Sequence, residues 1–120
     1  MLSVLMPAYN AEKYIAAAID SIASQKSYVD IEILVCDDCS TDGTAQIVRE
    51  KMKSIDGLRL FSLDKNQGVS AARNRLLTEI RPESEYVAFL DSDDVLVPHA
   101  YQKALTALKN SPGTQLTISK

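Results

Sequence analysis

The 120-residue chain has no tryptophan, one histidine and two cysteines, and it carries no excess of positive charge. Two cysteines do not suggest a secreted scaffold held together by disulfides. The 13 basic residues are outnumbered by 16 acidic ones, which leaves a net charge of −3. This balance argues against a general electrostatic affinity for nucleic acid or anionic lipid, so neither is expected as a partner.

Long hydrophobic runs are also absent. The apolar segment that begins at Met1 stops at Pro7 and has no basic leader, so it does not fit a signal peptide. Charged residues interrupt every other candidate for a membrane span. We therefore expect a cytoplasmic location, with membrane association only through segments outside this chain. The 46% hydrophobic and 24% charged residues are typical of one soluble globular domain.

Short apolar segments alternate with segments that have helical spacing of apolar residues. Strands are expected at residues 4–6, 31–36, 58–63, 86–90 and 115–118. The first strand is expected to end at Pro7, and the third to lie nearer an edge of the sheet. Four helices are expected between and after these strands, with inward apolar residues in each: Tyr14, Ile15 and Ile19 in the first; Ala45, Val48 and Met52 in the second; Val69, Ala72 and Leu76 in the third; Tyr101, Leu105 and Leu108 in the last.

Polar residues are suitably placed to begin these helices. Asn10 can cap the first helix, and Ser40 or Thr41 the second. Pro98 suits the first turn of the last helix. Repeated strand–helix units predict an α/β fold, a Rossmann-like open and mostly parallel sheet with helices on both faces. No linker divides residues 1–120, so we expect a single domain.

Acidic residues follow several of the expected strands. In folds of this type, ligands bind beyond the carboxyl ends of the strands, so these junctions are the candidate site. Asp91, Asp93 and Asp94 follow one buried strand, and Asp37 and Asp38 follow another. Carboxylates this close repel one another, and a divalent cation that also holds a diphosphate would relieve the repulsion. The alternative is that they are turn residues and helix caps that face solvent.

The cysteines form a Cys-x-x-Cys sequence, Cys36-Asp-Asp-Cys39, between a strand and a helix. Two aspartates between the sulfurs would oppose thiolate formation, which redox chemistry requires. A zinc site lacks ligands, because there is no second cysteine pair and His99 is the only histidine. We interpret Cys36 as the end of a buried strand, Cys39 as a loop residue and His99 as a surface residue.

Four motifs in order resemble the inverting family 2 glycosyltransferases of the GT-A fold, which include many bacterial enzymes of polysaccharide assembly. The resemblance covers residue 3 to about residue 101. The motifs are Pro7-Ala-Tyr-Asn10, Asp37-Asp-Cys-Ser-Thr-Asp-Gly43, Asn66-Gln-Gly-Val-Ser-Ala-Ala-Arg-Asn74 and Asp91-Ser-Asp-Asp94. Cys39 and Leu76 stand where family members usually have a small residue or glycine, which bears on the subtype more than on the class.

The resemblance implies a donor-binding role for residues of all four motifs. Tyr9 would lie against the nucleotide base, and Asp38 would bond the edge of a uracil. Asp91 would hold the ribose or the metal, and Asp93 would bind Mn²⁺ or Mg²⁺ on the diphosphate, with Asp94 as a further candidate. The remaining implied donor-binding residues are Pro7, Ala8, Asp37, Gly68, Arg73 and Ser92.

The resemblance further implies a metal-assisted transfer of a sugar, from a nucleotide-sugar donor that is a UDP-sugar by preference, to an acceptor hydroxyl with inversion. The family's catalytic base comes from a later segment, so no residue here is assigned to catalysis, and the base is expected after Lys120. A glycan or lipid-linked acceptor would bind there too. The chain is therefore expected to be the donor-binding half of a longer enzyme and to be inactive alone.

Two other classes of function remain open at this point. A signalling receiver domain has the same length and an acidic sheet edge, but it needs carboxylates after its first strand, where this chain has Tyr9 and Asn10. Asp64 and Lys120 could serve as its phosphoacceptor and its lysine. A mononucleotide-binding domain without catalysis is the second alternative.

Overall fold

Strands and helices alternate along the chain in the computed structural model, which describes residues 1–110. This order confirms the predicted α/β class. The strand expected at 115–118 lies outside the described residues. The strands are β1 (Leu2–Ala8), β2 (Ile31–Asp37), β3 (Leu58–Ser62) and β4 (Tyr86–Phe89), and the helices are α1 (Ile15–Ala23), α2 (Thr44–Met52), α3 (Val69–Leu77) and α4 (Ala100–Asn110).

The four strands form one parallel sheet in the order β3-β2-β1-β4. β3 is at an edge, as predicted. β1 pairs with β2 along its whole length, from Leu2↔Ile31 to Ala8↔Asp37, but with β4 only as far as Leu5↔Phe89. The strand order reverses at β1, since β2 and β3 lie to one side of it and β4 to the other. A crevice for a ligand is expected at such a switch point.

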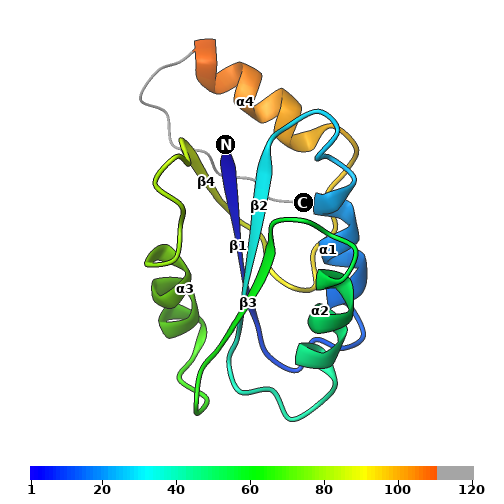
Figure 1. Ribbon diagram of the computed structural model, residues 1–120, viewed down its shortest axis with the longest axis vertical. Helices are drawn as coiled ribbons and strands as arrows, with labels where there is room; N and C mark the ends of the chain where they lie inside the picture. Colours follow the sequence, from blue (N-terminus) through cyan, green and yellow to red (C-terminus); the bar gives the residue numbers. More distant parts are fainter. Residues whose placement is uncertain (111–120) are drawn as a thin grey trace.

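Helices cover both faces of the sheet (Figure 1). On one face, α1 and α2 pack over β1 and β2, and Tyr101 and Leu108 of α4 join the same core. On the other face, α3 is the only helix within residues 1–110, with Ala72 and Leu76 against Leu5 and Leu34. The central strands are thus buried on both sides, which explains their continuous apolar sequence. No helix within residues 1–110 has the length and apolar character needed to span a membrane.

Pro7 does not end the first strand, which corrects the expectation from the sequence. It pairs with Cys36 of β2, and the strand continues to Ala8. Proline usually disrupts a sheet because it lacks a backbone N–H. Here β4 no longer pairs with β1 beyond Leu5, so Pro7 has a neighbouring strand on one side only.

The first two helices begin later than predicted, and the predicted capping residues form other hydrogen bonds. α1 begins at Ile15, and the side chain of Asn10 instead accepts a hydrogen bond from the backbone N–H of Thr41 at 2.9 Å. α2 begins at Thr44, whose N–H donates to Asp42 rather than to Ser40 or Thr41. A contact between the two loops thus takes the place of the predicted cap at Asn10, and Asp42 takes the place of Ser40 or Thr41 at the start of α2.

Three side chains expected to point inward are exposed. Tyr14 is 56% exposed, Met52 40% and Val69 51%. Each lies at or next to the end of a helix, where the next turn of helix is missing and cannot cover the side chain. Ile15, Val48 and Leu76 are fully buried as predicted, whereas Ala45 and Leu105 are only partly buried.

Candidate functional site

A pocket of about 320 Å³ lies at the carboxyl end of the sheet, at the switch point beside β1. The end of β1, the loop after it, the residue after β2, the first turn of α3 and the loop after β4 all contribute to it. It is lined by Pro7, Ala8, Tyr9, Asn10, Ala11, Tyr14, Asp38, Val69, Ala72, Asp91, Ser92 and Asp93. Seven of the residues predicted from the sequence therefore share one cavity: Pro7, Ala8, Tyr9, Asp38, Asp91, Ser92 and Asp93.

One wall of the pocket is built by two loops that bond to each other. The backbone N–H of Ala11 donates to the Thr44 hydroxyl at 2.8 Å, and that of Gly43 donates to the Glu12 carboxylate at 2.8 Å. Burial alone would raise the pKa of Asp42, but hydrogen bonds from Thr44 and from the backbone of Glu12 outweigh it and lower that pKa. These contacts hold the β1–α1 loop, and with it Tyr9, which is half exposed. An exposed ring on a rigid wall suits stacking against a planar base.

Asp38 connects this wall to the start of α3. It is 4% exposed, and its two carboxylate oxygens accept hydrogen bonds from the N–H groups of Gln67 and Gly68 at 2.8 and 2.9 Å. Gly68 has φ +95° and ψ 168°, a conformation that is essentially restricted to glycine. A Cβ there would meet nothing within 4 Å, so the backbone conformation, not crowding, requires glycine.

Asp37 and Gly68 are not among the residues that line the pocket. The Asp37 carboxylate is buried and accepts hydrogen bonds from the backbone and hydroxyl of Ser40, which shapes the turn after β2. Asp37 thus holds the turn after β2, and Gly68 holds Asp38 at the start of α3. Their predicted contacts with a nucleotide stay predictions.

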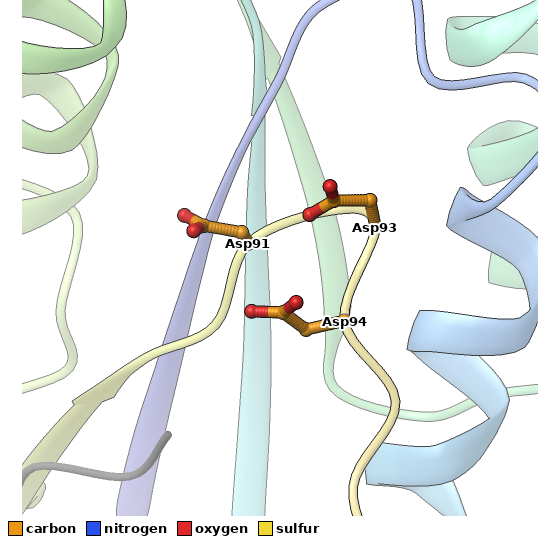
Figure 2. Close-up of side chains that lie close together, drawn as sticks. All are labelled: Asp91, Asp93 and Asp94. Carbon is orange, nitrogen blue, oxygen red and sulfur yellow. The ribbon is translucent and has the colours of Figure 1, made fainter. Parts of the chain in front are cut away.

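Asp91, Asp93 and Asp94 form the acidic part of the site (Figure 2). Each can offer one carboxylate oxygen such that all of these atoms lie within 4.8 Å of one another. Asp91 and Asp93 are exposed and line the pocket. Hard oxygen donors in this number and spacing fit Mg²⁺ or Mn²⁺, so the residues present are compatible with the predicted cation.

Arg73 lies beside this cluster rather than in the lining of the pocket. Its guanidinium is 3.6 Å from the Asp91 carboxylate and 5.4 Å from the centre of the Phe89 ring. The Nε of Arg73 is buried without a hydrogen-bond partner. The Phe89 ring and Asp91 thus hold the Arg73 guanidinium at the rim of the acidic cluster. From there the guanidinium could reach a phosphate.

The cysteines and the histidine lie where the sequence predicted. Cys36 is buried in β2, and burial is the main cause that raises the pKa of its thiol to about 11. Cys39 is exposed in the loop, and both thiols are free. The His99 ring lies against that of Tyr28 at a tilt of 57°, with 4.5 Å between ring centroids, and it does not line the pocket. A raised pKa disfavours the thiolate that a redox pair requires.

Sequence analysis missed several residues of the pocket. Tyr14 and Val69 were expected in the core by their helical spacing, yet both are exposed and line the cavity, whereas Ala72 is buried as expected and also borders the cavity. Apolar periodicity cannot separate a residue packed under a helix from one that faces a cleft at its end. One feature of the sequence could have indicated them: residues in the first turn of a helix that follows a ligand-binding loop often face the ligand.

The sequence profile described as "Glycosyl transferase family 2" matches residues 3–117. The chain belongs to this family. Among curated relatives of this family 2 chain is the UDP-Glc:alpha-D-GlcNAc-diphosphoundecaprenol beta-1,3-glucosyltransferase WfgD of Escherichia coli, 37% identical over 112 residues. That match spans 92% of this chain and 42% of WfgD.

Solved structures show the same architecture. TarS 1–349 of Staphylococcus aureus in complex with UDP-GlcNAc superposes with a TM-score of 0.80 and 38% identity, over 91% of this chain and 31% of TarS. The mannosyltransferase PcManGT of Pyrobaculum calidifontis, in complex with GDP-Man and Mn²⁺, has a TM-score of 0.78 and 27% identity, over 89% of this chain and 32% of PcManGT. The family 2 chain thus has the predicted GT-A architecture and spans less than half of each of these three relatives. The receiver-like and non-catalytic alternatives are not favoured.

Proposed function

We propose that this family 2 chain binds the nucleotide-sugar donor of a glycosyltransferase that transfers the sugar, with inversion, to a hydroxyl of a glycan or lipid-linked acceptor. The observation that carries the proposal is the single pocket that joins an aromatic wall at Tyr9 to the acidic pair Asp91 and Asp93. A nucleoside diphosphate has two parts that match these, a flat base that can stack on the ring and a diphosphate that a cation held by the carboxylates would bind. The family match and the complexes of TarS with UDP-GlcNAc and of PcManGT with GDP-Man support this assignment.

The residues around the pocket divide between these two parts of the donor. Tyr9 stacks on the base, Asp38 bonds its edge, and Pro7 and Ala8 form the floor beneath it. Asp91 and Ser92 hold the ribose and the start of the diphosphate. Uridine is the base we propose, as in the ligand of the TarS complex.

The acidic cluster and Arg73 act on the leaving group. Asp93, with Asp91, would hold Mn²⁺ or Mg²⁺, and the cation would offset the negative charge that develops on the diphosphate. Arg73 approaches the same charge from α3, 3.6 Å from Asp91. This chain therefore orients the donor and stabilises the leaving group, two effects separate from activation of the acceptor hydroxyl.

Isothermal titration calorimetry with UDP, in the presence and absence of Mn²⁺, tests the proposal. Mn²⁺ should strengthen UDP binding, and Asp93→Asn should remove most of that gain. Asp64→Asn is the matched control, since Asp64 follows β3 but does not line the pocket. UMP should gain less from Mn²⁺ than UDP because it lacks the second phosphate.

Two results would count against the proposal. Equal UDP affinity with and without Mn²⁺ would overturn the metal role of Asp93. Failure of UDP, GDP and dTDP alike to bind the wild-type chain would overturn donor binding as a whole, whereas tighter binding of GDP would overturn only the choice of uridine.

A further inference from the structure

The segment that follows the acidic cluster is hydrogen-bonded to the end of α1 and to the turn after it. The backbone N–H of Leu96 donates to the Ser21 hydroxyl at 3.0 Å. The side-chain amide of Gln25 donates to the backbone carbonyl of Val97 at 3.1 Å, and its oxygen accepts from the N–H of Tyr101 at 2.9 Å. Ser21 of α1 and Gln25 in the turn after it therefore bond Leu96, Val97 and Tyr101 between the cluster and the first turn of α4.

Gln25 has no access to solvent that could replace these bonds. Its side chain is 2% exposed, so each polar atom needs a partner within the protein. The N–H of Tyr101 is one of the first N–H groups of α4, which lack partners inside the helix. Gln25, in the turn after α1, thus caps α4 and at the same time holds the chain that leads into it.

Other contacts hold this segment only in part. On the sheet side, the last backbone bond before the cluster joins the N–H of Leu90 to the carbonyl of Leu5 at 3.1 Å. After the cluster, Leu96 is buried, but Val95 and Val97 on either side of it are 52% and 67% exposed. Exposed side chains contribute little packing, so the bonds from Ser21 and Gln25 carry much of the restraint on this side.

We infer that Gln25, with Ser21, is a positioning residue for the Asp91–Asp94 loop: it fixes the path of the chain after the loop so that the carboxylates are held together before a cation arrives. The inference rests on the proposed function, since it assumes that these carboxylates bind a metal. A metal site depends on the partners that orient its ligands as well as on the ligands themselves. Gln25 does not line the pocket and would act through the backbone.

Gln25→Met tests this role, because methionine has similar length but can form neither bond. We expect the gain in UDP affinity from Mn²⁺ to fall about tenfold, as for loss of other partners that orient metal ligands. UDP affinity without metal should fall much less, since the wall at Tyr9 and Asp38 is held by other bonds and only the ribose contacts of Asp91 and Ser92 would loosen. In the metal-free chain, amide hydrogen exchange at Leu96 and Tyr101 should accelerate.

Two control variants separate positioning from general loss of stability. Val48→Ala removes a fully buried side chain of α2 in the same core and should lower stability without changing the gain from Mn²⁺. Gln46→Met alters a glutamine on the exposed side of α2 and should change neither quantity. If Gln25→Met does not fold, Ser21→Ala decides, because it removes the bond to Leu96 and, besides that, only the hydroxyl's bond to the Ala18 carbonyl within α1, and it should reduce the gain from Mn²⁺ to a smaller extent.

The outcomes distinguish the inference from the proposed function. A gain from Mn²⁺ in Gln25→Met equal to that of the wild type would overturn the inference alone. If Val48→Ala reduced the gain from Mn²⁺ as much as Gln25→Met does, the inference would also be overturned, because the reduction would then result from lower stability. Absence of any Mn²⁺ effect in the wild-type chain would overturn the metal role in the proposed function and, with it, the role of Gln25.

Discussion

Carboxylates occur at both ends of the sheet, but their surroundings are opposite. At the amino end, Glu32 in β2 is 2% exposed and surrounded by donors. It accepts hydrogen bonds from the Ser3 hydroxyl at 2.5 Å, from the Arg59 guanidinium at 3.1 Å and from the backbone N–H of Arg81 at 3.1 Å. The Arg81 guanidinium adds an ion pair at 3.4 Å. This carboxylate ties β1, β3 and the segment before β4 to the centre of the sheet.

At the carboxyl end, Asp91 and Asp93 are exposed, with carboxylate oxygens of the cluster within 4.8 Å of one another. Arg73 approaches Asp91 at 3.6 Å, in a pair that is about half exposed. Negative charge is thus concentrated where solvent and ligands have access. The comparison teaches that a carboxylate surrounded by internal donors stabilises the fold, whereas a group of exposed ones is available to an external cation.

The largest expected effect concerns Glu32. Glu32→Gln leaves Arg59 and Arg81 facing a neutral amide and weakens the bonds to Ser3 and the backbone. The free energy of unfolding should fall by about 3 kcal/mol, as for removal of one partner of a buried pair. Urea denaturation measures this.

Glu50→Gln is the control for this prediction, because Glu50 pairs with Lys53 on the surface and should contribute little. The comparison between the two ends of the sheet fails if the two glutamate variants lose similar stability. The gain in UDP affinity from Mn²⁺ should be unchanged in both.

Asp38 sharpens the comparison, because it is a buried carboxylate at the functional end. Asp38→Asn replaces one of two acceptors by a donor that would face the N–H of Gln67 or Gly68. We expect a loss of about 1–2 kcal/mol in the free energy of unfolding, measured by urea denaturation. If Asp38→Asn were as stable as the wild type, the bonds from Gln67 and Gly68 would not hold the loop. The role of a carboxylate would then depend on its position at the sheet edge rather than on its burial.

Cys39 tests whether the functional end also stores backbone strain. Its φ is +58°, in the left-handed region that side chains with a Cβ disfavour by about 1–2 kcal/mol. Cys39→Gly should raise the free energy of unfolding by about 0.5–1 kcal/mol, after allowance for the greater flexibility of glycine in the unfolded chain. Cys39→Ala keeps the Cβ and should show no such gain in thermal or urea unfolding. A gain of equal size in the alanine variant would indicate that the thiol, not the backbone, is unfavourable.

The smallest expected effect on stability concerns Asp93. Because Asp93 is exposed, Asp93→Asn should change the free energy of unfolding by less than about 0.5 kcal/mol in the absence of metal. Relief of repulsion with Asp91 favours a small increase. Urea denaturation of the metal-free chain measures it, and a loss as large as that of Glu32→Gln would show that Asp93 is part of the folded framework.

Much of the fold and of the site could be predicted from the sequence. Continuous apolar strands and helices of 3.6-residue period identified the α/β class, and the residues after the strands identified most of one pocket, from Tyr9 to Asp93. The predicted caps at Asn10 and Ser40 were wrong. Both side chains had equally good partners in another loop, 31 residues away for Asn10, and a local motif cannot show such a competitor.

The sequence by itself determined the elements, the sheet class and the acidic residues at its carboxyl edge, because these depend on periodicity and on residues within a few positions of one another. Only the tertiary structure decided which carboxylates serve the fold and which face the pocket. Glu32 and Asp93 are the same kind of group in the sequence, and their difference arises from Ser3, Arg59 and Arg81, which strand pairing brings to one of them and not to the other. The bonds from Gln25 to Val97 and Tyr101 have the same origin, since they join residues more than 70 positions apart. Contacts of this range follow from the order of strands in the sheet, which no local pattern contains.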